Sequence, residues 1–380
     1  MPTTVIVEPD PGGHRFQAVA NVAHVAGRAG DVLLLTSRGA VDDPAFDVYL
    51  HDLVLEVESP FTVIHPPTRE MAEAVAAVCR RADVSTVVVM DADQSLKRWW
   101  YAAPRALRGV PRPRVVFMLT RYPAKLRLTD WTGWKLRVPK ATLALAAMAT
   151  GSLHRTAGFA GRDDTTRGWI VKRTRDPDIC TAHSGDRERL RAELDLPADR
   201  RLVGIFGVIS ERKNADLIWA ALSRRAIQAD LVLAGGLSPG VASWAASLPE
   251  TDHGRVIVRD GFLSNESLDK HVAAVDVVPL ALTNNGPSGI MGKAIAAEVP
   301  VVTAGSEVRA RELVAADAGE LADLDADSLG AAIQRVFDRD PDRPRRSKVP
   351  SATPEEFAEK LLGVDDRGRV VRRPHRSSVR

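Results

Sequence analysis

The sequence has few of the residues that hold small secreted proteins together. Its 380 residues include only two cysteines, Cys79 and Cys180, which excludes a disulfide-stapled scaffold and a zinc site built on thiolates. The sequence also lacks an excess of either charge. It has 52 Lys and Arg residues and 49 Asp and Glu residues, for a formal net charge of +3. Dedicated nucleic-acid-binding domains are usually far more basic, so we expect no nucleic-acid partner.

Long hydrophobic runs are also missing. No stretch of about 18 apolar residues without charge occurs, so the sequence predicts no membrane-spanning helix. Residues 1–10 lack the basic start and apolar core of a signal peptide. Together with the two widely separated thiols, this favours a reducing, cytoplasmic location. At roughly 100–200 residues per domain, the length indicates two domains.

What the sequence does contain is a repeated alternation of short apolar runs and helical stretches. In the first half, strands are expected over residues 4–8, 32–36, 53–57, 86–90 and 114–119. In the second half, strands are expected over residues 202–206, 231–234, 256–258, 277–280 and 299–303. Apolar runs without alternation are typical of parallel strands that are covered on both faces. The sequence therefore predicts an α/β fold with two Rossmann-like domains.

Composition also suggests how the chain is divided. The expected segments are a first domain over 1–170, a polar linker over 171–199, a second domain over 200–338, a linker and a helix that packs back over 339–364, and a basic tail over 365–380. Proline and charge prevent residues 338–350 from building a core, whereas Pro354 is placed to start a helix. The tail is rich in arginine and poor in apolar residues, so we expect it to be disordered.

The most informative motif is GIFGVISERKN, residues 204–214. An apolar strand runs into Gly207, and two adjacent cations, Arg212 and Lys213, follow where a helix begins. Backbone N–H groups at a helix N-terminus attract anions, and neighbouring Arg and Lys add full charges. Ligands of α/β folds bind at the carboxyl ends of strands, so the motif predicts a diphosphate site. A solvated charged loop is the alternative.

Two further loops combine glycine with polar residues. In NNGPSGIMGK, residues 284–293, glycine and asparagine permit unusual backbone angles, and Ser288 is placed to cap the next helix. Ala294 stands where a phosphate-binding P-loop needs Ser or Thr, so that loop type does not fit. In PGGHR, residues 11–15, paired glycines let the backbone approach a ligand, and His14 suits a hydrogen-bond donor or base. Ordinary turns explain either loop equally well.

Two features of the first half have a functional and a structural interpretation. Asp91 and Asp93 follow an expected strand, where they suit either a divalent cation or a turn and helix cap. Residues 114–140 hold seven Lys and Arg residues and a single acid, with tyrosine and tryptophan among them. Cations beside aromatic side chains suit a membrane surface or an anionic acceptor. An irregular surface loop is the alternative.

Residues 200–305 resemble the nucleotide-sugar half of GT-B glycosyltransferases, in particular the retaining family 4. The matching segments follow the family's order: GIFGVISERKN, LVLAGG, RDGFLSNESL and DVVPLALTNNGPSGIMGKAIAAEVPVVT. The glycine turn at residues 12–13 agrees with the family's N-terminal loop. The resemblance implies a GT-B fold, with two Rossmann-like domains facing each other across a cleft. It also implies transfer of a sugar from a UDP-, GDP- or dTDP-linked donor with retention, and without a metal or other cofactor.

The resemblance also implies roles for individual residues. Arg212, Lys213 and His14 are the expected catalytic residues, the two cations holding the donor diphosphate. Other donor-binding residues are expected to be Gly12, Gly13, Gly207, Phe262, Leu263, Asn285, Ser288, Gly289, Ile290 and Lys293. The first domain, including the basic aromatic segment, is expected to bind a sugar-bearing, lipid-linked or small-molecule acceptor. From the seven cations and one acid of the segment itself, we also expect peripheral contact with the inner membrane face. The acceptor-binding residues of the segment are Arg121, Tyr122, Lys125, Trp131 and Trp134.

One departure from the family concerns the donor. The family commonly has two glutamates eight positions apart, where this sequence has Asn285 and Lys293. The second glutamate usually grips the ribose, and a lysine cannot accept hydrogen bonds from hydroxyl groups. Either the ribose is held otherwise, or Lys293 meets a phosphate or a carboxylate-bearing sugar, or activity is lost. A non-catalytic subunit that activates a partner glycosyltransferase and a sugar-nucleotide epimerase are therefore the alternatives, and a metal-dependent GT-A enzyme using Asp91 and Asp93 is a third.

Overall fold

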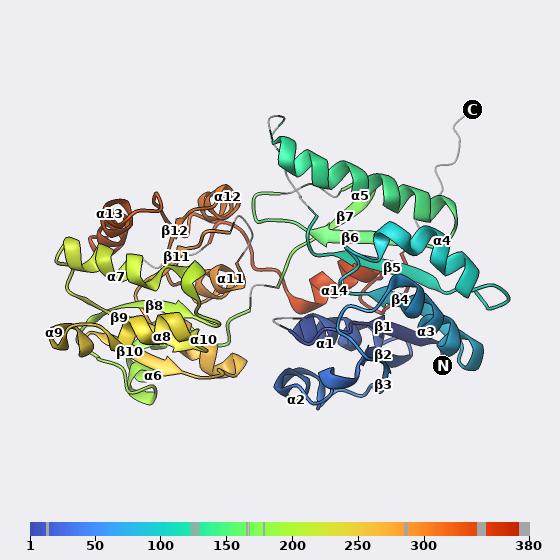
Figure 1. The fold of residues 1–380 in the computed structure, drawn as a ribbon, viewed down its shortest axis with the longest axis horizontal. Coiled ribbons are helices and arrows are strands. Elements are labelled where there is room, and N and C mark those ends of the chain that lie inside the picture. Colours follow the sequence, from blue (N-terminus) through green and yellow to red (C-terminus); the bar gives the residue numbers. More distant parts are fainter. Residues whose placement is uncertain are drawn as a thin grey trace. The chain divides into compact units, whose positions relative to one another are not determined.

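The computed structural model describes residues 1–12, 15–122, 126, 128, 130–164, 166, 168–177, 179–284, 288–339 and 347–371. The chain forms two units, shown in Figure 1. The first unit comprises Met1–Ala160, Asp164–Asp176 and Thr353–Arg380, and the second comprises Gly161–Asp163 and Pro177–Ala352. The end of the chain thus returns to the first unit.

The first unit is built on a seven-stranded parallel sheet of order β3-β2-β1-β4-β5-β6-β7. Its strands are β1 (Thr3–Val7), β2 (Asp31–Ser37), β3 (Glu56–Phe61), β4 (Val84–Val89), β5 (Arg114–Leu119), β6 (Arg155–Phe159) and β7 (Val171–Thr174). Strand order reverses between β1 and β4, which pair directly from Thr3↔Val84 to Val7↔Val89. In open α/β sheets this switch point is where ligands bind, at the carboxyl ends of the strands.

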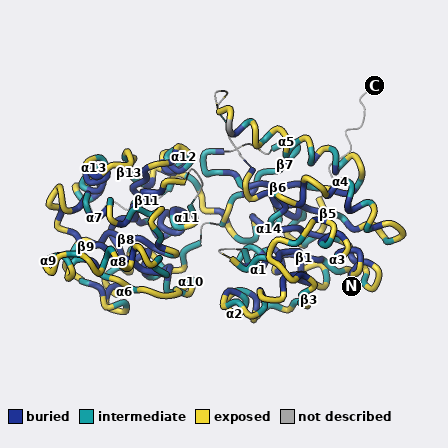
Figure 2. The backbone as a smooth tube through the Cα atoms, in the orientation of Figure 1, coloured by how far each residue is buried: buried dark blue, intermediate teal, exposed yellow. Residues whose placement is uncertain are grey.

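Helices cover both faces of this sheet. They are α1 (Arg15–Ala26), η1 (Arg38–Ala40), α2 (Pro44–Leu50), α3 (Thr68–Arg81), α4 (Leu96–Ala106), α5 (Trp131–Ala149) and α14 (Pro354–Leu362). One core joins α3, α4 and α5 to the sheet around Trp99 and Phe117, and the other joins α1, α2 and α14 around Phe16 and Phe357. The central strands are buried, whereas the edge strand β3 and the outward faces of the helices are largely exposed or partly exposed (Figure 2). These two cores explain the apolar runs without alternation in the sequence.

One expected strand lies three residues further along the chain. We expected a strand over residues 53–57, but β3 covers Glu56–Phe61. The Leu53 N–H donates to the Leu50 carbonyl and the Leu55 N–H to the Leu53 carbonyl, so this stretch forms the turn after α2. Its leucines pack on the core from the turn, which is why their apolar character resembles a strand.

The segment expected as a linker, residues 171–199, contains ordered elements of both units. Strand β7 adds to the edge of the first sheet through Val171 and Thr174, both buried. After it come η2 (Ser184–Asp186) and α6 (Arg187–Glu193) of the second unit, where Leu190 is buried in the core. The polar composition reflects the short, partly exposed elements at the edge of each unit.

The second unit has two three-stranded parallel sheets of order β10-β9-β8 and β11-β12-β13. The strands are β8 (Arg201–Phe206), β9 (Ala229–Gly235), β10 (Val256–Asp260), β11 (Val278–Ala281), β12 (Val301–Ala304) and β13 (Gly319–Leu321). An isolated bridge between Val203 and Val277 connects the two sheets. The helices are η3 (Glu211–Lys213), α7 (Ala215–Arg224), α8 (Pro239–Ala246), α9 (Glu250–His253), α10 (Asn265–Ala274), α11 (Gly289–Ala296), α12 (Glu307–Ala316) and α13 (Ala326–Phe337).

Helix α14 starts at Pro354, as the sequence suggests. The Thr353 hydroxyl caps it by accepting the Glu356 N–H at 3.1 Å. Phe357 stacks on Phe159 with the ring centroids 6.0 Å apart, and its carbonyl accepts a hydrogen bond from the Thr174 hydroxyl. After the helix, Val364 bridges to Val370, and the tail from residue 372 onward lies outside the described residues. In the part of the chain described, no helix is both long and apolar enough to cross a membrane.

Candidate functional site

In the second unit, the ends of β8 and β9 approach each other closely. Gly207 follows β8 with a φ of +79°, and its N–H donates to the Ala234 carbonyl at 3.0 Å. Gly235 ends β9 with a φ of +134°, and a Cβ at this position would collide with the carbonyl of Gly207. Glycine is therefore required where the backbone turns away from the sheet, as at a site that a ligand approaches closely.

Lys213 lies at this turn. Asn214 adopts left-handed backbone angles and its side-chain amide donates to the Ala281 carbonyl at 2.6 Å, which ties the start of α7 to the end of β11. The partly buried Lys213 ammonium points back and donates to the Phe206 carbonyl at the end of β8. Burial, together with the neighbouring Arg212 charge, lowers the pKa of Lys213 to about 8. Among the described residues, no carboxylate forms an ion pair with this ammonium.

The other charged residues of the motif at 204–214 do not neutralise its cations. Arg212 is exposed and has no hydrogen bond or ion pair with the residues that the structure describes. The acid of the motif, Glu211, instead accepts a hydrogen bond from the Ser238 hydroxyl at 2.9 Å, at the cap of α8. The loop after β8 thus presents two cations and a glycine backbone, the arrangement that binds phosphate.

The end of β10 lies beside the same edge. The Asp260 carboxylate accepts the Leu237 N–H at 2.9 Å, and the Gly261 N–H donates to the Gly235 carbonyl at 3.3 Å. Phe262 follows with 69% of its surface exposed, while Leu263 is partly buried against the core. An exposed phenyl ring beside a phosphate-binding loop offers a flat apolar surface for a nucleotide base.

Helix α11 begins at the end of the second sheet. The Ser288 hydroxyl caps it by accepting the Met291 N–H at 3.4 Å, and Gly289 and Ile290 form its first turn. The chain before it is held by Arg309, whose buried guanidinium donates to the carbonyls of Leu282 and Asn284, each at 2.8 Å. The sequence contained no signal for Arg309, which lies on α12, 25 residues from Asn284.

The placement of Lys293 differs from the expected donor contact. The Lys293 side chain is buried and its ammonium lies 2.5 Å from a carboxylate oxygen of Asp269 on α10. The other oxygen of Asp269 accepts from the N–H and the hydroxyl of Thr181, at 2.8 and 3.1 Å. Because a matched carboxylate neutralises it inside the unit, the Lys293 charge is directed at the core and not at a donor phosphate.

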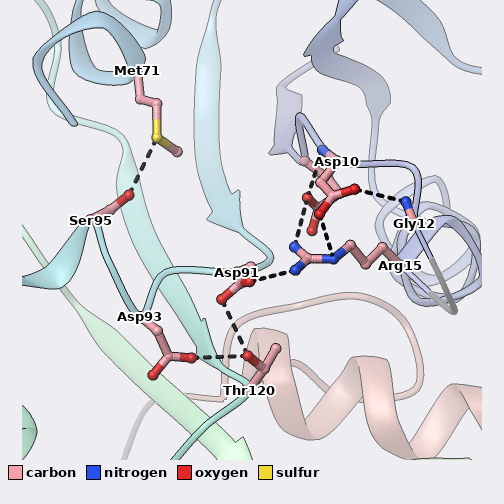
Figure 3. A network of polar contacts seen from close by, with 9 residues as sticks. Asp10, Gly12, Arg15, Met71, Asp91, Asp93, Ser95 and Thr120 are labelled. Carbon is pink, nitrogen blue, oxygen red and sulfur yellow. Dashed lines mark hydrogen bonds and ion pairs between the residues drawn. The ribbon is translucent and has the colours of Figure 1, made fainter. Parts of the chain in front are cut away.

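In the first unit, the carboxyl ends of β1, β4 and β5 hold a polar network (Figure 3). Arg15 of α1 contacts three carboxylates: Glu8 and Asp10, each at 3.3 Å, and Asp91 at 2.8 Å. Only 1% of Glu8 is exposed, and this burial raises the pKa of its carboxyl group to about 8, against the opposing effect of Arg15. This network lies at the β1–β4 switch point, and the sequence did not predict it as a unit.

The two aspartates after β4 are already satisfied by protein partners. The Thr120 hydroxyl donates to Asp91 at 3.2 Å and to Asp93 at 3.0 Å, and the Lys140 ammonium contacts Asp93 as well (Figure 3 shows the Thr120 contacts). In the described ranges, no cluster of three or more His, Cys, Asp or Glu side chains is suited to a metal ion. Asp91 and Asp93 thus accept hydrogen bonds from protein groups in this structure, as the turn interpretation expects.

The four predicted acceptor residues that the structure describes differ in exposure. Trp131 is 70% exposed, and the Arg121 side chain is exposed as well. Tyr122 is buried instead, with the guanidinium carbons of Arg137 and Arg173 at 5.9 and 5.3 Å from its ring centroid. Trp134 is partly buried and contacts the same Arg137, at 5.5 Å. Tyr122 thus packs inside the unit, at odds with its expected contact with an acceptor.

The remaining predicted residues fall in two groups. Gly12 lies in a turn closed by its own N–H, which donates to Asp10 at 2.9 Å. Gly13, His14, Lys125 and Asn285 lie outside the described residues. Within the second unit, the structure brings together Gly207, Arg212 and Lys213 at one edge, with the end of β11 joined to them through Asn214.

Comparison with known proteins supports the fold. No protein-family model and no curated protein matches the sequence. Solved structures match over nearly the whole chain. A sucrose-phosphate synthase from Thermosynechococcus elongatus has a TM-score of 0.61 at 17% identity, covering 96% of this chain and 95% of the other.

Two further structures show the same similarity. Anabaena HepE in complex with UDP-glucose has a TM-score of 0.61 at 17% identity, covering 96% of this chain and 95% of the other. The lipopolysaccharide outer core galactosyltransferase WaaB, in its apo form, has a TM-score of 0.55 at 14% identity, covering 96% of each chain. With two parallel-sheet, Rossmann-like halves, this chain has the GT-B fold, as predicted.

Proposed function

We propose that this chain is a glycosyltransferase that moves a sugar from a nucleotide-sugar donor to an acceptor. In this proposal the donor diphosphate binds at the end of β8, against Gly207, Arg212 and Lys213. The observation that carries it is the Lys213 ammonium, which is partly buried beside a second cation and, within the part of the chain that the structure describes, contacts a backbone carbonyl and no carboxylate. A diphosphate supplies the anionic charge that this pair of cations needs.

The surroundings of the cations support a nucleotide as the rest of the ligand. Exposed Phe262 offers a stacking surface for a base, and the N–H groups of Gly289 and Ile290 at the start of α11 attract a phosphate oxygen. HepE, which shares the fold, was solved with UDP-glucose, so we take a UDP-sugar as the first donor to test, with GDP- and dTDP-sugars next.

The proposed chemistry depends on the leaving diphosphate. As the bond between sugar and phosphate breaks, negative charge develops on the leaving oxygen, and Arg212 and Lys213 stabilise it with preorganised positive charge. The acceptor oxygen attacks the anomeric carbon from the face that the diphosphate leaves and gives its proton to the leaving phosphate oxygen, so the configuration is retained. The two cations neutralise the phosphates without a metal ion in this scheme.

One observation favours a second candidate, a non-catalytic subunit that activates a partner glycosyltransferase. Lys293 stands where the resembling family usually has a glutamate that binds the ribose. The Lys293 ammonium forms an ion pair with Asp269. A chain without a ribose contact at this position still binds a diphosphate, but it has lost one means of orienting the donor.

Calorimetric titration tests the donor site directly. We expect the wild-type protein to bind UDP, GDP or dTDP, and Lys213→Ala and Arg212→Ala each to weaken binding about 10- to 100-fold, as for the loss of one charged hydrogen bond. Arg224→Ala, an exposed arginine at the other end of α7, is the matched control and should bind as wild type. Unchanged binding by Lys213→Ala would contradict the diphosphate assignment.

Turnover separates the alternatives. A protein that binds UDP and releases it from a UDP-sugar only with an acceptor is a transferase. One that converts the donor into its isomer without an acceptor is an epimerase, and one that binds without turnover is the non-catalytic subunit.

A further inference from the structure

The region around α4 and α5 differs in charge from the rest of the chain. Residues 94–162 contain fourteen Lys and Arg residues and one acid, Asp130, whereas the rest of the chain is net acidic. The single acid is also occupied, because its carboxylate caps α5 by accepting the Gly133 N–H at 2.8 Å. Helices α4 and α5 themselves contain no Asp or Glu residue.

Helix α5 exposes several large apolar side chains on its outward face. Trp131, Val138 and Leu145 recur every seven residues, so they lie on one face of the helix, and they are 70%, 53% and 47% exposed. The inner face packs on the core through fully buried Ala144 and Ala147 and partly buried Leu143 and Met148. Helix α5 thus has an apolar inner face and further exposed apolar residues on a face that an ordinary surface helix fills with polar ones.

Helix α4 extends the same surface. It packs beside α5 on the same face of the sheet, as Figure 1 shows for the first unit. Its outward positions include exposed Lys97 and Arg98, together with Trp100, which is 41% exposed. On α5, the exposed Lys135 ammonium lies 5.6 Å from the centre of the Trp131 ring. We call the outward residues of these helices the α4–α5 surface: Lys97, Arg98, Trp100, Arg105, Trp131, Lys135, Leu136, Val138 and Leu145.

We propose that the α4–α5 surface docks on an anionic lipid bilayer. Tryptophan rings settle at the depth of the headgroups, the aliphatic side chains enter the acyl boundary, and lysine and arginine pair with lipid phosphates. The exposed row from Trp131 to Leu145 spans about 21 Å along the helix axis, enough to lie flat in the interface. Since α5 is not apolar enough to cross a membrane, it lies on the surface of the bilayer.

The mixture of side chains favours a bilayer over a macromolecule. A duplex nucleic acid presents a charged backbone, which suits the cations but gives exposed Leu136, Val138 and Leu145 little apolar area to contact. The centre of a protein interface is depleted of lysine, whereas here Lys135 lies among the apolar residues. This inference does not depend on the proposed transferase activity, because the donor site belongs to the other unit.

Vesicle co-sedimentation of the full chain tests the proposal. We expect binding to vesicles of phosphatidylglycerol and phosphatidylcholine, and at least tenfold weaker binding to vesicles of phosphatidylcholine alone. The double variants Trp131→Ser/Leu145→Ser and Lys97→Glu/Lys135→Glu should each raise the lipid concentration for half-maximal binding at least tenfold. The charge variant and 0.5 M salt should remove the same electrostatic component.

Matched controls lie outside the surface. Val54 is fully exposed in the turn before β3, and Arg38 is exposed after β2, so Val54→Ser and Arg38→Glu should bind vesicles as wild type does. Thermal unfolding of every variant establishes that its fold is intact. Folded variants that bind anionic vesicles like wild type would overturn the proposal, as would a wild-type protein that ignores them. A wild-type dimer that the same substitutions dissociate would also overturn it, because a second copy would then cover the surface.

Discussion

Lys213 holds a charge that its surroundings oppose. Burial and Arg212 lower its pKa from the ordinary 10.5 to about 8, so keeping it protonated at pH 7 costs the ligand-free protein up to about 3 kcal/mol. Such a cost is typical of a group placed for a ligand and not for stability. The same reasoning separates Lys213 from Lys293, whose charge a buried carboxylate neutralises.

We therefore predict that Lys213→Met stabilises the ligand-free protein at pH 7. The folded-state pKa lies below the unfolded one, so the unfolded state binds more protons between about pH 8 and 10.5, and wild-type stability rises with pH across this window. The variant should have a higher Tm at pH 7 and should lack that part of the rise, as thermal unfolding at pH 7, 8.5 and 10 will measure. Lys348→Met, which changes a lysine exposed at the surface, is the control. A lower Tm for Lys213→Met at pH 7 would mean that the ammonium serves the fold.

Among the elements, α10 and α11 are joined by a buried ion pair. Asp269 and Lys293 are both buried, and Thr181 adds two hydrogen bonds to the same carboxylate. Removing one partner leaves an uncompensated charge inside the unit, which costs about 3–5 kcal/mol, whereas replacing both by apolar residues costs much less.

We predict that Asp269→Ala lowers the free energy of unfolding by about 3–5 kcal/mol and that Asp269→Leu/Lys293→Met recovers most of it. Urea unfolding of wild type, Asp269→Leu, Lys293→Met and the double variant completes a double-mutant cycle. Because Lys293 faces Asp269, the folded double variant should bind UDP within a few-fold of wild type. If the double variant is as stable as wild type but no longer binds UDP, Lys293 contacts the donor, as the family resemblance implied.

Features within one continuous segment could be predicted from the sequence, whereas contacts between separate elements could not. The strand, glycine and adjacent cations of residues 202–213 are contiguous, so their placement followed from local pattern alone. Strands β6 and β7 were not expected, because RTAGF and VKRT are short and partly polar. The Glu8–Arg15–Asp91 network and the Lys293–Asp269 pair join residues from separate elements, and only the order of strands and the packing of helices brings them together.

In the molecule as a whole, the first unit is built from both ends of the chain. The second unit ends at Ala352, and α14 then completes the first unit. Phe357 and Leu361 are buried with Ile6, Phe16 and Val116. The Arg155 guanidinium, on β6, donates to the carbonyls of Leu361 and Lys360 at the end of α14, at 2.9 and 2.5 Å. The first unit therefore needs the last helix of the chain, although β1 lies at its beginning.

We predict that ending the chain at Ala352 unfolds the first unit and leaves the second folded. Loss of the buried Phe357 side chain alone, as in Phe357→Ala, should cost about 3–5 kcal/mol, and loss of the whole helix more. Hydrogen exchange read by mass spectrometry should show β1, β4 and β5 losing protection in the truncated chain while β8 and β9 keep theirs. A chain ending at Val371 keeps α14 and should exchange like wild type. If β8 and β9 lose protection together with β1, the prediction is wrong. The two units then unfold cooperatively, although their cores around Phe117 and Phe206 are distinct.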